Sequence, residues 1–139
     1  MEEFSRTELL IKKEGIGALQ NSTVAIFGVG GVGGFVVEAL ARAGVGTLHI
    51  IDHDTVSISN LNRQIIATHQ TINQKKVEVM KERILSINPH CHVLTYDDFF
   101  LPETVDHFPF DEFDYIVDAV DTVTAKIKLV EIAQEKKIK

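Results

Sequence analysis

The sequence predicts an α/β fold in which a Rossmann-like parallel sheet carries flanking helices. Three observations lead to this prediction. Short apolar runs alternate with segments of helical periodicity along nearly the whole chain. A glycine-rich turn joins the first apolar run to the helix that follows it. The 139 residues, 45% hydrophobic and 24% charged, are enough for one domain with a sizeable core.

The first half of the chain contains two predicted helices and two predicted strands. Ser5-Arg6-Thr7-Glu8 has the spacing of a capping box, so a short helix is expected to begin there. Residues 23–27 are apolar and largely β-branched, which is typical of a buried parallel strand. Residues 33–43 have helical periodicity, and Gly44 follows where a left-handed cap would end that helix. A second strand is expected over residues 47–52.

A long polar segment, residues 55–73, follows the second strand. It is rich in Ser, Asn, Thr and Gln and lacks a clean period, so it predicts a loop with one helical turn. Loops of this length tend to be functional. The next helix is expected over residues 75–86, because apolar residues recur along one face and Asn88-Pro89 stops it. A third strand is expected over residues 92–96.

The C-terminal part repeats the pattern with a strand over residues 115–120 and a helix from about 124 to 136. Strands that alternate with crossover helices imply a parallel sheet with right-handed crossovers. The same alternation predicts a fifth strand beginning near Ile138. We therefore interpret residues 1–139 as the N-terminal part of a larger domain that is incomplete at its C-terminus.

Composition narrows the classes of function. The net charge is -6 and the pI is near 5.4, so the average surface repels phosphate-rich polymers. No apolar run approaches the roughly 20 residues that a membrane span needs. The single cysteine, Cys91, excludes an internal disulfide and a cysteine-only zinc site. We expect a cytoplasmic protein with no membrane contact evident in this segment.

The glycine-rich turn predicts a nucleotide site. Gly28-Val29-Gly30-Gly31-Val32-Gly33 fits G-x-G-x-x-G between a strand and a helix, and Asp52 lies at the end of the second strand. The glycines let a phosphate approach the backbone, the helix N-terminus offers free amides, and the carboxylate accepts hydrogen bonds from ribose hydroxyls. Either NAD or ATP satisfies these residues.

Polar side chains after the second and fourth strands favour ATP over NAD. Ligands of an open parallel sheet bind at the carboxyl ends of its strands, where two cations, two amides and several carboxylates converge. A nicotinamide ring needs a mostly apolar slot, whereas a triphosphate needs cations and a carboxylate for its magnesium ion. Asp118 is a weaker candidate than Asp121, because a role in the turn after its strand is enough to explain it. The converging residues are Asp52, His53, Asp54, Asn60, Arg63, Gln64, Lys76, Asp118 and Asp121.

These residues together resemble the ubiquitin-activating-enzyme-like adenylating superfamily, which includes the HesA, MoeB and ThiF proteins. The resemblance covers nearly the whole chain and implies one ATP-binding adenylating domain over residues 1–139, acting with ATP and Mg²⁺ in a homodimer. It also implies residue roles. The ATP-binding residues are Gly28, Gly30, Gly31, Gly33, Asp52, Asp54, Asn60, Arg63, Gln64 and Lys76; the catalytic residues are Arg6 (from the partner subunit), Arg63, Lys76 and Asp121, of which Asp121 binds magnesium.

Within the superfamily the chain most resembles the tRNA threonylcarbamoyladenosine dehydratase branch (TcdA, also CsdL). The resemblance rests on residues 4–10, 62–65, 77–89 and 118–121. It implies ATP-dependent carboxylate activation that cyclises threonylcarbamoyladenosine in tRNA, with sulfur-transfer proteins as possible partners and tRNA bound mostly outside this segment.

Three alternatives to this reading stay open. The nearest is activation of the C-terminus of a ubiquitin-like sulfur carrier. An NAD-dependent oxidoreductase keeps the glycine turn but leaves Arg63, Lys76 and Asp121 unexplained. The third is a non-catalytic nucleotide-binding or interaction module.

Three other features are interpreted as structural. His90-Cys91-His92 lies in the turn before the third strand, at the opposite edge from the site, and is not expected to bind metal. His53 is expected to turn away from both neighbouring aspartates by strand alternation. The acids Asp97, Asp98, Asp111, Glu112 and Asp114 are expected to form a solvated, electronegative edge that disfavours tRNA.

Overall fold

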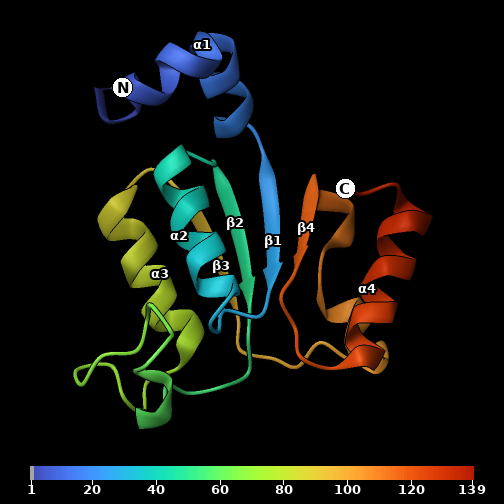
Figure 1. Cartoon of the computed structure of the whole chain (residues 1–139). Helices are drawn as coiled ribbons and strands as arrows, with labels where there is room; N and C mark the ends of the chain where they lie inside the picture. Colours follow the sequence, from blue (N-terminus) through green and yellow to red (C-terminus); the bar gives the residue numbers. More distant parts are fainter. Residues whose placement is uncertain (1) are drawn as a thin grey trace.

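The computed structural model describes residues 2–139 and contains a four-stranded parallel sheet with helices on both faces (Figure 1). The strand order is β3-β2-β1-β4, so the order reverses beside β1. A crevice forms at the carboxyl ends of the strands where such a sheet reverses, and ligands bind there. The predicted α/β parallel fold is confirmed. The strands are β1 (Thr23–Phe27), β2 (Thr47–Ile51), β3 (His92–Tyr96) and β4 (Tyr115–Asp118).

Two cores form because successive side chains of a strand point to opposite faces of the sheet. Helices α2 (Gly33–Ala43) and α3 (Lys76–Ile87) cover one core, which includes Ile26 and Ile50. Helix α4 (Val123–Lys136) covers the other, where Phe27 stacks on Phe110 at a centroid distance of 5.7 Å. Three further phenylalanines contact the Phe27 ring: Phe100, Phe108 and Phe113.

Helix α1 (Ser5–Gln20) differs from its prediction in two ways. The capping box is wrong: Phe4 occupies the N-cap and no side chain caps the helix, because the 3₁₀ turn η1 (Glu2–Phe4) runs directly into it. The helix is also longer and is broken at Lys12, whose φ is 63°. As Figure 1 shows, α1 lies beyond the amino ends of the strands, away from their carboxyl ends.

The remaining elements fall within two residues of their predicted bounds. Gly44 ends α2 in the left-handed conformation, with a φ of 92°, as predicted. Strand β4 stops at Asp118 rather than at residue 120, because its partner β1 ends at Phe27 and Gly28 turns the chain with a φ of 97°. The last ladder bond runs from the N–H of Ala119 to the carbonyl of Phe27 at 2.9 Å. The polar loop contains the predicted single turn, η2 (Ile58–Asn60).

The connection from β3 to β4 holds two 3₁₀ helices that the sequence did not indicate, η3 (Pro102–His107) and η4 (Phe110–Glu112). After α4, the backbone N–H of Ile116 in β4 donates to the carbonyl of Lys139 at 2.7 Å. No strand is assigned near Ile138, so the fifth strand stays a prediction. Across residues 2–139, no helix combines the length and apolarity that crossing a membrane requires.

Candidate functional site

A cavity of about 610 Å³ lies at the carboxyl ends of the strands. Its lining comes from five places in the chain: the glycine turn, the end of β2, the polar loop with the start of α3, the end of β3, and the turn before α4. Nine of the residues expected at the site meet there: Gly28, Gly30, Gly31, Asp52, Asp54, Arg63, Gln64, Lys76 and Asp121.

The glycine turn is packed too tightly for side chains at its ends. Gly28 has a φ of 97°, and a Cβ on it would stand 2.4 Å from the carbonyl oxygen of Ala119. A Cβ on Gly33 would stand 1.7 Å from the carbonyl oxygen of Gly28. Gly33 therefore does not line the cavity but lets α2 begin directly against the turn, with its N-terminus facing the crevice.

Asp52 fixes the shape of the turn from the end of β2. Its Oδ2 accepts the backbone N–H of Val29 at 3.0 Å, and its Oδ1 accepts that of Asp54 at 2.9 Å. A carboxylate offers about four acceptor positions, so both oxygens can still receive hydroxyl donors from a ligand. The geometry is thus compatible with the ribose contact that the sequence predicts for this carboxylate.

Lys76 brings a buried cation to the cavity. Its side chain is 6% exposed, and its Nζ lies 3.7 Å from Oδ2 of Asp54, a carboxylate that is half exposed. The backbone N–H of Lys76 donates to the carbonyl of Asp54 at 3.0 Å, which holds the first turn of α3 against the end of β2. Burying an ammonium group is costly without a close anion, so this position favours a negatively charged ligand.

Arg63 adds a second cation on the polar loop. Its Nη1 donates to the carbonyl of Ser59 at 3.1 Å and to Oδ1 of Asn62 at 2.9 Å. Its aliphatic stem lies against Gly31, with Cγ 3.6 Å from the position of a Cβ there. Both recorded partners are neutral, so they orient the guanidinium beside the glycine turn without neutralising its charge.

Besides Gly33 and Asp118, two predicted residues stand outside the cavity lining. The side chain of Asn60 is buried, and its Oδ1 accepts the backbone N–H of Ser57 at 2.9 Å, so it shapes the loop that carries Arg63. Arg6 is exposed on α1, at the opposite end of the sheet (Figure 1). A role for Arg6 at this cavity within the same chain is therefore not supported by its position.

The two acids after β4 have different surroundings. Oδ1 of Asp118 accepts Nζ of Lys126 at 3.1 Å and the backbone N–H of Val120 at 3.3 Å, so Asp118 serves the turn, as expected. Asp121 is exposed and lines the cavity. Of the two acids, only Asp121 lines the cavity.

The expectation for His53 is wrong. Its Nε2 lies 3.1 Å from Oδ1 of Asp54, and its ring stacks on Phe99 at a centroid distance of 3.5 Å. Strand alternation does not apply, because β2 ends at Ile51 and leaves this residue in the following loop. Asp52, His53 and Asp54 place ligand-type atoms within 4.8 Å of one another.

An apolar wall of the cavity was missed at the sequence level. Phe99, Phe100 and Leu101 follow β3 and line the cavity beside Asp98. The signal was available, since every loop at the carboxyl edge of a parallel sheet is a candidate lining segment. Of this segment, the sequence prediction includes only Asp97 and Asp98, as acids of an electronegative edge.

The acids of that edge are mostly exposed, as expected, but several of them are also paired. Asp97 lies 2.6 Å from Lys75, Asp98 lies 2.7 Å from His107, and Asp111 lies 2.8 Å from Lys136. Oδ2 of Asp114 accepts the backbone N–H of Thr23 at 2.8 Å. Spacing along the sequence could not reveal these partners, because they come from other elements.

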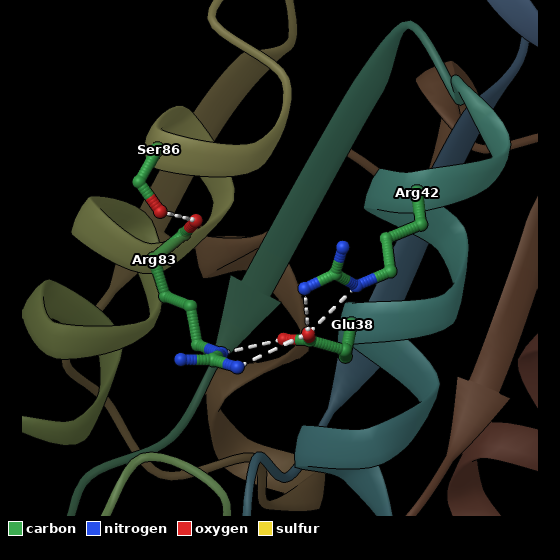
Figure 2. A network of polar contacts seen from close by, with 4 residues as sticks. All are labelled: Glu38, Arg42, Arg83 and Ser86. Atoms are coloured by element: carbon green, nitrogen blue, oxygen red, sulfur yellow. Dashed lines mark hydrogen bonds and ion pairs between the residues drawn. The ribbon is translucent and has the colours of Figure 1, made fainter. Parts of the chain in front are cut away.

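An ion-pair network ties together the two helices whose first turns border the cavity. Figure 2 shows Glu38 of α2 between Arg83 of α3 and Arg42 of its own helix. Glu38 Oε2 lies 3.1 Å from Nη2 of Arg83 and 2.7 Å from Nη2 of Arg42. The hydrogen bond from Arg83 lowers the pKa of Glu38 below its ordinary value. The network therefore joins α2 to α3.

Cys91 has no chemical role at the cavity. Its thiol is buried at the opposite end of the sheet, and burial raises its pKa to about 11. A thiol with so high a pKa is a poor nucleophile and a poor metal ligand at neutral pH.

Comparison with known proteins adds independent findings. A model of the ThiF family matches residues 4–139. A tRNA threonylcarbamoyladenosine dehydratase of Bacillus subtilis (strain 168) is 50% identical over 130 residues, which are 94% of this chain and 51% of that protein. The molybdopterin-synthase adenylyltransferase of Escherichia coli (strain K12) is 38% identical over 120 residues, covering 84% of this chain and 46% of that protein.

A solved structure agrees with the same family. The E. coli tRNA N6-threonylcarbamoyladenosine dehydratase TcdA in complex with ATP is 37% identical and superposes with a TM-score of 0.95, covering 99% of this chain and 56% of that one. The same enzyme has been solved in complex with AMP, with the same TM-score. The chain spans about half the length of the curated relatives named here, since it covers 51% and 46% of them.

Proposed function

Because this chain belongs to the ThiF family, we propose that it forms the ATP-binding part of an enzyme that activates a carboxylate by adenylation. The observation that carries the proposal is the buried Lys76, which lines the same cavity as Arg63 and the glycine turn. Two cations at a glycine turn suit a triphosphate, whereas NAD carries only a diphosphate and also needs a mostly apolar slot for its nicotinamide ring.

In the proposed reaction, an oxygen of the substrate carboxylate attacks the α-phosphorus of ATP. The bond between that phosphorus and the bridging oxygen of pyrophosphate breaks, and pyrophosphate leaves with the electron pair. No general base is needed, because a carboxylic acid with a pKa near 4 is already ionised at neutral pH. The protein's part is therefore positioning and charge neutralisation, by Asp52 at the ribose and by Arg63 and Lys76 at the phosphates.

Asp121 is the proposed magnesium ligand. Mg²⁺ at nucleotide sites is usually bound by one or two carboxylates together with phosphate oxygens and waters, and an exposed carboxylate in the cavity fits that pattern. Bound there, the ion would supply charge compensation for the departing pyrophosphate.

Arg6 is proposed to act in the partner subunit of a homodimer. It lies on α1, far from the cavity of its own chain (Figure 1). Leu9 and Leu10 on the same helix are 81% and 85% exposed, and adjacent exposed apolar side chains are typical of an association surface.

The proposed substrate is threonylcarbamoyladenosine in tRNA, which the whole protein would cyclise in the cytoplasm. The support is the name of the B. subtilis relative and of TcdA. The acyl-adenylate would be captured within the substrate itself, so that water is lost overall. Sulfur-transfer proteins remain possible partners in this proposal.

The alternative proposal is adenylation of a carrier protein. The similarity to the molybdopterin-synthase adenylyltransferase supports this alternative. The two are separated by incubating the full-length protein with ATP, magnesium and either tRNA that bears threonylcarbamoyladenosine or a carrier protein. Cyclised nucleoside detected by mass spectrometry supports the first. Pyrophosphate release that depends on the carrier alone would replace it with the second.

A further inference from the structure

Helix α1 is broken into two pieces at Lys12. This residue has a φ of 63° and a ψ of 178°, and it is the one residue inside this fully described helix with non-helical dihedral angles. A side chain is strained at these angles, which glycine adopts far more readily. Such strain persists only where the surrounding structure holds the residue in place. Contacts on both sides of Lys12 are therefore needed to maintain the break.

Phe4 anchors the N-terminal piece to the rest of the chain. Helix α1 has no buried residue along its described length, whereas Phe4, directly before it, is 4% exposed. The Phe4 ring lies against the end of α2, where its Cε1 is 3.1 Å from the position of a Cβ on Gly44. Figure 1 shows the N-terminal piece of α1 beside this end of α2.

The anchor and the end of α1 meet because the helix is broken. In an unbroken helix, residues 4 and 20 would lie about 24 Å apart along one axis. Instead, Phe4 and Gln20 line the same small cavity, of about 210 Å³, at the amino ends of the strands. The break thus turns the N-terminal piece back over the molecule and lets the Phe4 ring reach Gly44.

Gly15 makes room for the break on the other side of Lys12. A Cβ on Gly15 would stand 2.6 Å from the Cβ of Ile11. In a regular helix the Cβ atoms of residues four apart are about 5–6 Å apart, so this close approach belongs to the broken form. A Cβ on Gly17 would meet no atom within 4 Å among the described residues. Of these two glycines, only Gly15 is required by the break.

Arg6 lies on the anchored N-terminal piece, two residues from Phe4. Its side chain is exposed, as are those of Leu9 and Leu10 on the same piece. Two residues of chain span at most about 7 Å, so the anchor restricts where the backbone of Arg6 lies. A guanidinium on an unanchored helix end would lose more conformational entropy on reaching one fixed point, and small misplacements of a catalytic group are costly.

We propose that Phe4, Lys12 and Gly15 are positioning residues, which together hold Arg6 where it serves the cavity of the partner subunit. This inference rests on the proposed function of Arg6 in a homodimer. Phe4 fixes the far end of the N-terminal piece, the break at Lys12 turns that piece back, and Gly15 makes the turn possible. None of the three lines the nucleotide cavity of its own chain.

The first test compares Gly15→Ala with Gly17→Ala in the full-length protein. Both changes favour a regular helix, because alanine is a better helix former than glycine. Only Gly15→Ala places a methyl group against Ile11. We expect kcat for tRNA cyclisation to fall at least about tenfold in Gly15→Ala and to stay unchanged in Gly17→Ala. Equal kcat values in the two variants would overturn the inference.

Mixed dimers separate a positioning role from a folding defect. Gly15→Ala mixed with Arg63→Ala should regain activity, because the Arg63→Ala chain supplies a well-placed Arg6 to the intact cavity of its partner. Gly15→Ala mixed with Arg6→Ala should regain none, because neither chain supplies a well-placed arginine. Once mass spectrometry verifies subunit exchange, the opposite pattern or equal behaviour of the two mixtures would overturn the inference. If Arg6→Ala itself keeps full activity, the proposed function of Arg6 fails instead, which separates the two claims.

The anchor is tested by changing the size of the side chain at Phe4. Phe4→Ala should lower kcat as Gly15→Ala does, because the ring no longer holds the N-terminal piece against Gly44. Phe4→Leu should recover most of the activity, since leucine still fills part of that space. A fully active Phe4→Ala protein would show that the ring does not position Arg6.

Thermal unfolding tests the break itself. Lys12→Gly should keep activity and should not lower the unfolding midpoint, because glycine adopts these dihedral angles without strain. Lys13→Gly changes a neighbouring exposed lysine that has helical dihedral angles, and it should lower the midpoint by about 3 °C. Equal decreases in the two variants would show that Lys12 is helical in solution and would overturn the inference.

Discussion

The carboxylate of Asp52 accepts the backbone N–H of Val29 at 3.0 Å, joining the end of β2 to the glycine turn that follows β1. The same carboxylate accepts the N–H of Asp54 at 2.9 Å. An acid that the sequence indicates as a ligand for ribose therefore also holds the protein's own backbone. The proposed ribose contact contributes to nucleoside affinity, and the backbone contacts contribute to the free energy of unfolding. The two quantities can be measured separately.

Asp52→Asn should weaken nucleoside binding and stability together. An amide group has one acceptor oxygen, so its NH₂ must face one of the two backbone donors. We expect adenosine affinity to fall at least about tenfold and the free energy of unfolding to fall by about 1–2 kcal/mol. Urea unfolding and calorimetry measure the two effects. Asp106→Asn, an exposed acid outside the cavity, is the matched control and should change neither.

His49 should make stability depend on pH near neutrality. Its ring is 2% exposed, lies 2.9 Å from the hydroxyl of Tyr96, and packs against Phe113. Burial lowers the pKa of His49 below its ordinary value of 6.5, an effect that nearby His92 increases and Glu112 opposes. The unfolded chain therefore binds a proton more readily. The stability associated with a neutral His49 is present above pH 6.5 and is lost as the pH falls.

The measurement is the free energy of unfolding in urea at pH 7.5 and at pH 5.5. The decrease between these values should be smaller in His49→Phe than in the wild type, by up to about 1.4 kcal/mol per pH unit below 6.5. His69→Phe, which changes an exposed histidine, is the control. An equal decrease in wild type and His49→Phe would contradict the assignment.

The ion pair between Glu38 and Arg83 should contribute more to the free energy of unfolding than the pair between Glu38 and Arg42. Arg83 meets both carboxylate oxygens and joins two helices, whereas the Arg42 side chain is 59% exposed and lies on the same helix (Figure 2). Double-mutant cycles with Glu38→Gln should give about 1 kcal/mol for Arg83→Met and below about 0.5 kcal/mol for Arg42→Met. Because the pKa of Glu38 is lowered, this contribution is present above about pH 4.5 and is lost as the pH falls further. Equal coupling energies would show that bidentate geometry does not matter here.

Arg6 should complement a damaged site in trans. Full-length Arg6→Ala and Arg63→Ala proteins are each expected to lose activity, and mixing them should restore part of it. In some mixed dimers one site would receive both intact arginines. Restoration is measured as tRNA cyclisation after subunit exchange has been verified by mass spectrometry. No recovery in proven mixed dimers would refute the role of Arg6.

The fold was predictable because its strands carry continuous apolar runs and its glycine turn has a fixed place between a strand and a helix. The positions of Lys76 and Asp121 at the cavity followed from one rule, that loops at the carboxyl ends of parallel strands meet. The start of α1 near Ser5 was predictable but its cap was not, since Ser5-Arg6-Thr7-Glu8 has a capping pattern whatever turn precedes it. The 3₁₀ turn over Glu2–Phe4 places Phe4 at the N-cap of α1 and leaves the helix without a side-chain cap.

Contacts between distant elements set the rest of the site. The stacking of His53 on Phe99 joins the ends of β2 and β3, and no local spacing reports it. The phenylalanine cluster around Phe27 likewise gathers residues of η4 and its neighbours that show no shared period. Gln64 could be assigned to the site from its motif, but only the structure shows that its amide oxygen is buried and unpaired.

The central claim is that the cavity binds ATP through the cations at the glycine turn. Comparing the affinities of two nucleotides tests this claim most directly. Calorimetric titration of the wild-type chain with ATP and magnesium, and separately with NAD, gives the two values of Kd. We predict that ATP binds more tightly than NAD and that Lys76→Met weakens ATP by at least about tenfold without changing adenosine binding. Tighter binding of NAD than of ATP, or an unchanged Kd for ATP in Lys76→Met, would contradict the account.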